Sequence, residues 1–252
     1  MLVLEDLTKL SLPNLRDCVG AGEPLNPEVI AQWRAATGIT IRDGYGQTES
    51  VILCGSFPSL EVRPGSMGKP APGIDLHVID DEGQSLPSGR EGDIAVRVNP
   101  EHPLGLVRGF RHSAEQTRAC FRGDWYVTGD RAYRDSDGYF WFVGRADDVI
   151  LSSGYRIGPF EVESALIEHR AVAEAAVVSS PDEIRGEVVK AFVVLAPGYQ
   201  PDDSLAKELQ EHVKRVTAPY KYPRKVEFVA ELPKTVSGKI RRIELRKREW
   251  GK

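Results

Sequence analysis

The sequence predicts an α/β fold in two parts: a sheet segment with a small antiparallel, β-barrel-like region, followed by a small α+β domain. Two observations lead to this prediction. Short alternating apolar stretches separated by turn sequences fill residues 72–144, which is typical of antiparallel strands. Helical and strand patterns alternate over residues 158–250. The 252 residues, 41% of them hydrophobic, suffice for one large or two modest domains.

The first part is expected to begin with a helix and a strand. Asn26 is a good helix cap, Pro27 suits the first turn and Gly38 can end the helix. Residues 39–46 then have the pattern of a short strand that runs into a turn. Further strands are predicted from IDLHVIDDEG (74–83), GDIAVRV (92–98), WYVTGD (125–130) and GYFWFVG (138–144).

The second part is predicted to run helix, strand, strand, helix, strand, helix. Gly158 and Pro159 form a good helix entry. The strands are expected at VAEAAVVSS (172–180), EVVKAFVVLA (187–196) and KVEFVAEL (225–232), and a basic helix should end the chain. The helical period places these residues on buried faces: Val162, Ala165, Leu166 and His169 in the first helix, and Leu205, Leu209, Val213 and Val216 in the second.

The two parts are expected to meet at the stretch GRADDVILSSGYRIGP, residues 144–159. A charged joint, a glycine-tipped loop and a helix start follow one another there. We therefore predict two domains, residues 1–146 and residues 147–252. Asp147, at the boundary, is interpreted as a hinge.

Composition excludes several classes of protein. No apolar run approaches the roughly 18 residues that suggest a membrane span, and the N-terminus lacks the features of a signal peptide. Three scattered cysteines favour a soluble protein of a reducing compartment without a disulfide framework or a zinc site. We expect no metal cluster among the five histidines.

Charge is distributed unevenly along the chain. Residues 207–252 hold 14 Lys and Arg against 6 Asp and Glu, whereas the preceding residues hold 19 against 31. A basic tail on an acidic body suggests a polyanionic partner, with a solvated basic helix as the alternative. Nucleic acid is disfavoured, because aromatic residues are not interleaved with the basic ones.

Two short motifs of the first part suit a nucleotide. The glycines of GAGEPL (20–25) let a backbone approach a flat ligand, although an ordinary loop has the same composition. In DGYGQTES (43–50), Tyr45 can stack on a base, Thr48 can donate to a phosphate and Glu49 can hold Mg²⁺. Each of these residues alone suits a structural role equally well.

Three further residues suggest binding or catalysis. Asp130 and Arg145 lie at predicted strand ends and could bracket a ribose, or else cap turns and form a surface ion pair. Lys239 lies in the loop PKTVSGKIRR (233–242). This loop is not a P-loop, because Pro233 replaces the first glycine and Ile240 follows the lysine.

Together these motifs resemble a known superfamily. In order and spacing, YGQTE, the TGD aspartate, GRADD, SGYRIGPFEVE and LPKTVSGK resemble signatures of the AMP-forming adenylate ligases, which include acyl-CoA synthetases, luciferases and peptide-synthetase adenylation domains. The stretches RADDVILSSGYRIGPFEVE, SSPDEIRGEVVKAFVVL and TAPYKYPRKVEF are similar to the medium-chain acyl-CoA synthetase branch. The resemblance covers essentially the whole chain. The chain would comprise the C-terminal part of the large adenylate-forming domain, followed by the mobile C-terminal lid domain.

The resemblance implies a role for each matching residue. Lys239, Thr48 and Glu49 would be catalytic, with Glu49 the Mg²⁺ ligand and Lys239 placed on the carboxylate and α-phosphate during adenylation. Asp130 and Arg145 would hold the ribose, and Arg156, with Thr48, would contact the acyl-adenylate. The ATP and AMP site would comprise Gly22, Glu23, Pro24, Asp43, Gly44, Tyr45, Gly46, Gln47, Thr48, Asp130, Arg145 and Lys239. The CoA site would comprise Ser153, Gly154, Tyr155, Arg185, Lys214, Tyr222, Pro223 and Arg224.

The implied activity is ATP-dependent conversion of a medium-chain fatty acid to acyl-AMP, followed by transfer to CoA. ATP, Mg²⁺ and CoA would be needed, in the mitochondrial matrix if the protein is eukaryotic. The Thr/Ser/Gly-rich phosphate loop of these enzymes is not found in the sequence, so we expect an inactive fragment that lacks the N-terminal half of the same enzyme. A short-chain or aromatic acid–CoA ligase and a non-catalytic CoA- or nucleotide-binding module remain alternatives.

Overall fold

The computed structural model describes residues 11–236 and 238–251 of the chain. These divide into two compact units, and the split falls between Asp147 and Asp148, one residue after the expected boundary. We call the described residues up to Asp147 the first unit and the described residues from Asp148 the second unit. Among the described residues, no helix is long and apolar enough to cross a membrane.

The first helix of the first unit confirms the sequence prediction. Helix α1 spans Pro27–Thr37, and the Asn26 side chain caps it by accepting the Glu28 N–H at 2.7 Å. Gly38 ends the helix at φ 74°, a left-handed conformation in which a Cβ would be strained. Strand β2, Ile41–Gly46, follows as predicted.

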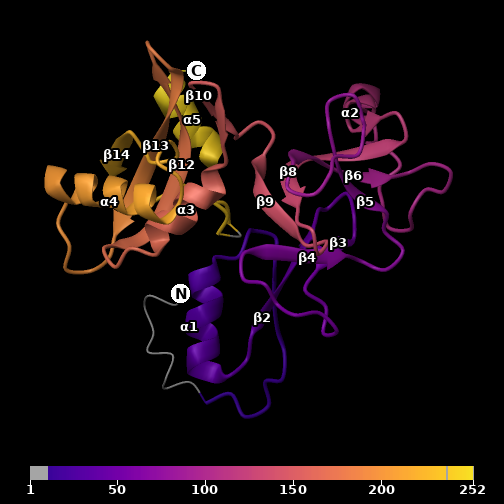
Figure 1. Cartoon of the computed structure of the whole chain (residues 1–252), viewed down its shortest axis with the longest axis horizontal. Coiled ribbons are helices and arrows are strands. Elements are labelled where there is room, and N and C mark those ends of the chain that lie inside the picture. The colour runs from indigo at the N-terminus through magenta and orange to yellow at the C-terminus, as the bar shows by residue number, and fades with distance from the viewer. Residues whose placement is uncertain (1–10, 237, 252) are drawn as a thin grey trace. The chain divides into compact units, whose positions relative to one another are not determined.

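One sheet organises the rest of the first unit. Within the described residues its strands follow the order β1-β2-β3-β4-β9-β8-β6-β5, with β7 paired to β8 (Figure 1). Only the β1–β2 pair among them is parallel, so the antiparallel prediction for this region is confirmed. The remaining elements are β1 (Cys18–Ala21), β3 (Ile52–Gly55), β4 (Ser66–Pro70), β5 (Leu76–Ile79), β6 (Glu91–Arg97), helix α2 (Ala114–Ala119), β7 (Phe121–Arg122), β8 (Trp125–Arg134) and β9 (Phe140–Arg145).

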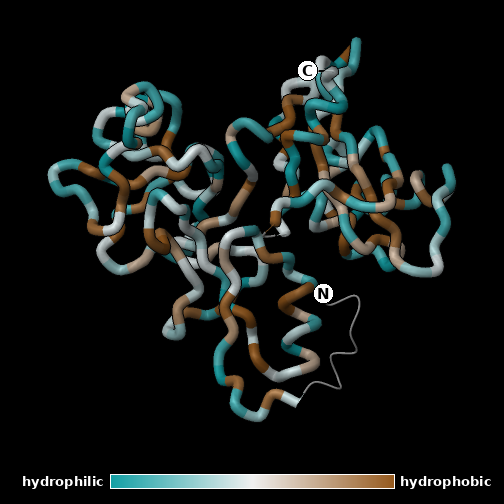
Figure 2. The backbone as a smooth tube through the Cα atoms, turned by 180° about the vertical axis from the view of Figure 1, so that it is seen from behind, coloured by the Kyte–Doolittle hydropathy of each residue, from teal (hydrophilic) through white to brown (hydrophobic). Residues whose placement is uncertain are grey.

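The core of the first unit is built from several of these strands. Burial alternates along β8, as in a strand with one buried face, whereas the five central residues of β6 are all buried. Figure 2 shows hydrophobic and hydrophilic segments mixed along the backbone. Leu53, Met67, Ile94, Tyr126 and Phe140, each from a different strand, form part of one buried cluster. This cluster supports the sheet from which the candidate site residues project.

The second unit contains the predicted order of elements, preceded by a hairpin. The hairpin consists of β10 (Ile150–Ser152) and β11 (Tyr155–Ile157). The elements that follow are α3 (Pro159–Ile167), β12 (Val172–Asp182), β13 (Gly186–Leu195), α4 (Asp203–Val216), β14 (Lys225–Phe228) and α5 (Arg242–Trp250). Among the described strands the sheet order is β11-β10-β13-β12, and β14 runs parallel to β13.

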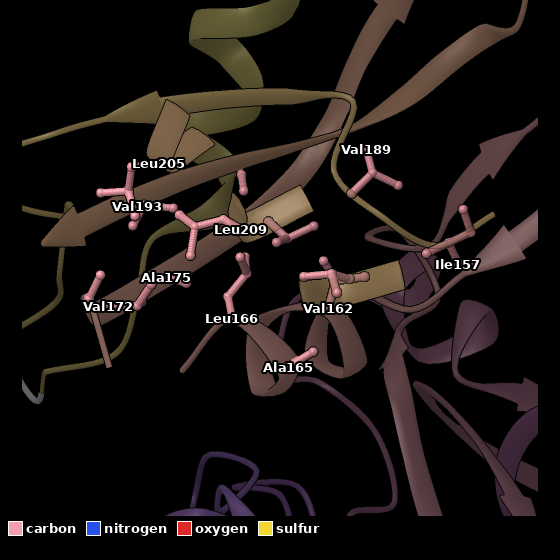
Figure 3. Packing of buried hydrophobic residues seen from close by; sticks show 14 of the residues in the cluster. Ile157, Val162, Ala165, Leu166, Val172, Ala175, Val189, Val193, Leu205 and Leu209 are labelled. Carbon is pink, nitrogen blue, oxygen red and sulfur yellow. The ribbon is translucent and has the colours of Figure 1, made fainter. Parts of the chain in front are cut away.

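Both faces of the β12–β13 pair are buried. On one face Val193 packs with Leu166 of α3 and Leu209 of α4, as Figure 3 shows. The opposite face carries Phe192, which packs against Leu245 of α5. Successive residues of β13 therefore serve different cores, which explains why residues 191–195 are all apolar.

Three details of the second unit differ from the sequence prediction. Val216 is 43% exposed, because it is the last residue of α4 and lies beyond the turn that packs on the sheet. His169 lies beyond the end of α3, which is capped at Glu168, so it does not belong to the helical face. The strand expected at 225–232 ends at Phe228, after which only Val229 N–H still bonds to β13, at Val193 O.

Candidate functional site

The parallel β1–β2 pair brings the first two motifs together. Ala21 pairs with Gly44, so the loop that starts at Gly22 lies beside the last residues of β2, Tyr45 and Gly46. Gly22 has φ 95°, a conformation that favours glycine. Burial raises the pKa of Asp43 to about 6, against lowering contributions from hydrogen bonds with the backbone N–H groups of Gly44 and Leu25. A buried carboxylate thus ties the GAGEPL loop to β2.

A bulge interrupts β2 at the position of the predicted base-stacking residue. The pairing with β3 shifts register between Tyr45 and Gly46. A Cβ on Gly46 would lie 2.4 Å from Val51 O, so no other residue fits this backbone path. Bulges turn side chains to new directions beside functional sites, and this one lies where the strand meets the QTE turn.

Asp130 is the centre of a polar cluster in the first unit. Its Oδ2 accepts the Tyr45 hydroxyl at 2.6 Å and the Gln47 amide at 2.7 Å. Arg145, its direct cross-strand partner on β9, places Nε 3.6 Å from Oδ1. Burial raises the pKa of Asp130, and the hydrogen bonds from Tyr45 and Gln47 and the charge of Arg145 oppose this rise.

Arg145 joins two acidic groups and remains accessible. Its side chain is 55% exposed, and Nε lies 3.5 Å from Asp147 Oδ1 as well as near Asp130. Gly129, at φ 77°, lies beside the guanidinium, where a Cβ would come within 3.7 Å of Nη2. The predicted ribose pair is therefore one ion pair on adjacent strands, with an exposed cation and a buried anion.

Thr48 and Glu49 lie in the turn that follows β2. The Thr48 residue is exposed, and Glu49 is half-buried, with its carbonyl oxygen held by Val107 N–H at 2.8 Å. The described residues contain no group of three or more His, Cys, Asp or Glu that could hold a metal. One carboxylate fits Mg²⁺ when phosphate oxygens and water supply the other ligands, as is common at nucleotide sites.

In the second unit, the β10–β11 hairpin presents the predicted tunnel loop. Ser153 and Gly154 form its two-residue turn with φ 51° and 83°, which is the pattern of a type I′ turn. Next to the turn, Tyr155 stacks on Tyr220 with ring centroids 4.3 Å apart. Ser152 pairs with Gly186, which follows Arg185, so this hairpin lies beside the β12–β13 turn.

Two cations surround one aromatic ring on the same unit. Lys214 Nζ lies 4.1 Å from the centroid of the Tyr222 ring, and Arg224 Cζ lies 4.8 Å from it. Arg224 also donates to the Tyr222 hydroxyl at 2.6 Å. Pro223, between these two residues, is buried, whereas Arg156 on β11 is exposed. The arrangement offers positive charge and a flat ring, which suits a phosphorylated heterocycle.

Lys239 lies in a closed loop. Thr235 N–H donates to Lys239 O at 2.8 Å, Lys239 N–H donates to Thr235 Oγ1 at 3.0 Å, and Arg241 N–H donates to Pro233 O at 2.8 Å. Lys239 is exposed at the end of this loop. These bonds link the two ends of the predicted loop around Lys239, and residue 237 of the loop lies outside the described residues.

Sequence reasoning missed two residues of these clusters. Tyr126 donates to Gln47 Oε1 at 3.3 Å, and Tyr220 stacks on Tyr155. The first could have been found from strand alternation, because Tyr126, Thr128 and Asp130 share one buried face of β8. The second carried only a weak signal, an aromatic residue within a basic loop.

Comparisons with known protein families match two parts of the chain. The AMP-binding enzyme family matches residues 2–108, and the AMP-binding enzyme C-terminal domain matches residues 161–239. The chain belongs to the AMP-binding enzyme family.

Curated relatives are acyl-CoA synthetases. The chain is 62% identical over 252 residues to the mitochondrial acyl-coenzyme A synthetase ACSM3 of Mus musculus, covering 99% of this chain and 43% of that protein. It is 58% identical over 254 residues to the mitochondrial ACSM5 of Homo sapiens, covering all of this chain and 44% of the relative. The chain therefore spans less than half the length of these relatives.

Solved structures of acid–CoA ligases share the fold. The anthranilate CoA ligase AuaEII in complex with anthranoyl-AMP is 41% identical with a TM-score of 0.89, covering 98% of this chain and 47% of that one. A benzoate CoA ligase from Burkholderia xenovorans LB400 is 36% identical with a TM-score of 0.79, covering 93% of this chain and 48% of that one. These likenesses confirm the predicted mixed α/β fold.

Proposed function

We propose that this chain supplies the nucleotide and CoA sites of an AMP-forming acyl-CoA synthetase. In the first step a carboxylate attacks the α-phosphorus of ATP, giving acyl-AMP and pyrophosphate. In the second step the CoA thiol attacks the acyl carbon, giving the thioester and AMP and losing its proton. The observation that carries the proposal is the Tyr45–Asp130–Arg145 cluster, to which strands β2, β8 and β9 each contribute one residue.

The nucleotide would be held by groups that the first unit already orients. Tyr45 offers a half-buried ring for the adenine, with Gly22, Glu23, Pro24, Asp43, Gly44 and Gly46 in the adjoining backbone. Asp130 and Arg145 would hold the ribose, because a carboxylate accepts from hydroxyl groups and a guanidinium donates to their oxygens. Thr48 would donate to the α-phosphate.

Two charged groups would serve the adenylation step. Glu49 would hold Mg²⁺ together with the phosphates of ATP, and the ion would neutralise phosphate charge when bound. Lys239 would place a positive charge on the carboxylate and the α-phosphate, stabilising the charge that develops at phosphorus. Arg156 would contact the acyl-adenylate.

The CoA site would lie on the second unit. Lys214 and Arg224 would bind phosphate groups beside the Tyr222 ring, with Arg185 near the hairpin. The chain's basic region, residues 207–252, supplies the matching charge for this polyanion. Ser153, Gly154 and Tyr155 would line the path of the pantetheine arm, and Asp147 would be the hinge between the half-reactions, since the units divide directly after it.

A medium-chain fatty acid is the acid that we favour. The reason is the sequence resemblance to the medium-chain branch of the acyl-CoA synthetases. The curated relatives at about 60% identity are mitochondrial acyl-CoA synthetases, which supports a mitochondrial location. An aromatic acid is the second candidate, because the solved neighbours AuaEII and the Burkholderia enzyme are named for anthranilate and benzoate.

A chimera tests the activity. The 252 residues are grafted in place of the matching segment of the mouse ACSM3 relative, which supplies the remaining length. Octanoate, butyrate and benzoate are compared in ATP–pyrophosphate exchange and in thioester formation. Octanoate should give the highest kcat/KM. Preference for benzoate would select the aromatic alternative, and AMP binding without exchange by any acid would select the non-catalytic module.

A further inference from the structure

The Gln47 side chain is directed into the protein. Its Nε2 donates to Thr128 O at 2.9 Å and to Asp130 Oδ2 at 2.7 Å, and its Oε1 accepts the Tyr126 hydroxyl at 3.3 Å. A primary amide has two N–H donors, and here both are used by the protein. The Gln47 amide nitrogen therefore has no hydrogen left for a nucleotide.

The neighbours of the amide fix which way it faces. Thr128 O and Asp130 Oδ2 are both acceptors, so they require the NH₂ group on their side. The Tyr126 hydroxyl meets the opposite, oxygen side, and Tyr126 is 2% exposed. A flipped amide would set its oxygen against a carboxylate and lose both donors.

Asp130 gains an asymmetric environment from this contact. Gln47 and Tyr45 both donate to Oδ2, whereas Oδ1 faces Arg145. The carboxylate is thus held with one oxygen satisfied inside the sheet and the other on the side of the exposed cation. Asp130 is 5% exposed, so water contributes little to its orientation.

We infer that Gln47, oriented by Tyr126, is a positioning residue that sets the Asp130 carboxylate for nucleotide binding and does not itself contact the nucleotide through its side chain. This inference rests on the proposed function, in which Asp130 holds the ribose. It replaces the direct contact that sequence resemblance implies for Gln47.

The inference has a consequence for pH dependence. The titratable and charged groups that face Asp130 are Tyr45, Tyr126, Arg145 and Asp147. Among the neighbours, the Gln47 amide is a donor to the ionised carboxylate and so opposes the rise in pKa that burial causes. Loss of the amide should raise the pKa of Asp130 further. On acidification, the variant should therefore lose nucleotide affinity at a higher pH than the wild type does.

The test compares Gln47→Met with the wild-type chain. Methionine has a similar volume but no donor, so the cavity stays filled. The Asp130 carboxyl carbon is titrated by NMR, and AMP affinity is measured by calorimetry from pH 5 to pH 8. Gln32→Met is the matched control, because Gln32 only donates to Glu28 on the exposed face of α1.

We expect Gln47→Met to raise the Asp130 midpoint by about one pH unit, the size expected from a lost charge-assisted hydrogen bond. AMP affinity should fall roughly tenfold more below the new midpoint than at pH 8. Gln32→Met should match the wild type. A merely structural role would lower affinity equally at every pH and leave the midpoint in place, and that result overturns the inference.

Two further outcomes are decisive. If Gln47→Met does not fold, Tyr126→Phe takes its place, because it removes only the group that orients the amide, and an unchanged Asp130 midpoint there overturns the role of Tyr126. If the midpoint moves but wild-type chain binds no AMP at any pH, the Gln47–Asp130 link stands and the proposed nucleotide site is rejected.

Discussion

At the scale of single residues, Asp43 combines burial with a negative charge. Burial raises its pKa from 3.8 to about 6, and only 8% of the residue is exposed. A buried acid that must ionise at neutral pH lowers stability, and groups of this kind concentrate at functional sites. What Asp43 contributes in return is its contact with the backbone of the GAGEPL loop at Leu25.

Asp43→Asn should therefore stabilise the chain at neutral pH. Because the folded state holds its proton up to about pH 6 and the unfolded state only to 3.8, wild-type stability should fall as pH rises through this window. Asparagine can still accept from Gly44 N–H, so the variant should gain about 2–3 kcal/mol above pH 6 and lose this slope. Urea unfolding of the wild type and the variant at pH 4, 5, 6 and 7 measures the free energy of unfolding. An equal gain in stability at all four pH values would contradict the raised pKa of Asp43.

At the scale of secondary-structure elements, α5 is anchored by buried charge. Arg242 at its first turn donates to both carboxylate oxygens of Glu163 on α3, at 2.9 and 2.7 Å, and Glu163 also accepts Val177 N–H at 2.8 Å. Arg246, one turn later, pairs with Asp148 at 2.6 Å. These contacts hold the helix that follows the Lys239 loop.

Glu163→Gln should unfold the second unit more easily than a matched surface change. The Glu163 side chain is 5% exposed, so the variant removes a buried carboxylate charge that accepts two hydrogen bonds from Arg242, at a cost of about 3–5 kcal/mol. Glu161→Gln is the control, since Glu161 pairs with Lys221 and is 45% exposed, and it should cost about 1 kcal/mol or less. Hydrogen exchange of the β12 amides measures the stability of the second unit in both variants. An equal loss of stability in the two would show that the Glu163–Arg242 pair does not anchor the unit.

The elements also show what the sequence could and could not predict. Helices α1 and α4 were predictable because they carry caps and long periodic patterns. Strands β1, β3 and β10 were not, since they have three or four residues and exist only through their partners. Likewise, the motifs revealed Asp130 and Tyr45, and strand alternation could have placed Tyr126 on the same face of β8 as Asp130. Its bond to Gln47 could not be predicted, because it joins residues 79 apart and no local pattern encodes the pairing.

At the scale of the whole molecule, the uneven distribution of charge along the chain bears on CoA binding. The cluster of Lys214, Tyr222 and Arg224 that we propose for CoA lies in the basic region, residues 207–252, so CoA affinity should depend strongly on ionic strength. We expect Arg224→Gln to weaken CoA binding to the 252-residue chain by about tenfold at low salt and by less at high salt, as loss of a phosphate contact predicts. Arg170→Gln is a control cation from outside the cluster. Salt-independent CoA affinity would contradict the assignment.

The two half-reactions should also separate at the level of the whole enzyme. In the chimera with the mouse relative, Lys239→Ala should lower ATP–pyrophosphate exchange by roughly a hundred- to a thousandfold, the effect of about 3–4 kcal/mol of lost charge stabilisation. Conversion of supplied acyl-AMP and CoA to thioester should stay near normal, because no new bond to phosphorus forms in that step. The ungrafted 252-residue chain should show no exchange, as its sequence has no phosphate loop.

Gly154→Leu should have the opposite effect. Gly154 has φ 83° in a turn where no atom lies within 4 Å of an added Cβ, so a branched side chain would strain the backbone and project outward from the hairpin. Thioester formation from supplied acyl-AMP should fall while exchange continues. Gly198→Leu is the matched control, because that glycine has φ 92°, open surroundings and a position outside the hairpin. If Lys239→Ala and Gly154→Leu reduce both half-reactions equally, the two loops do not serve separate steps and Asp147 is only a linker.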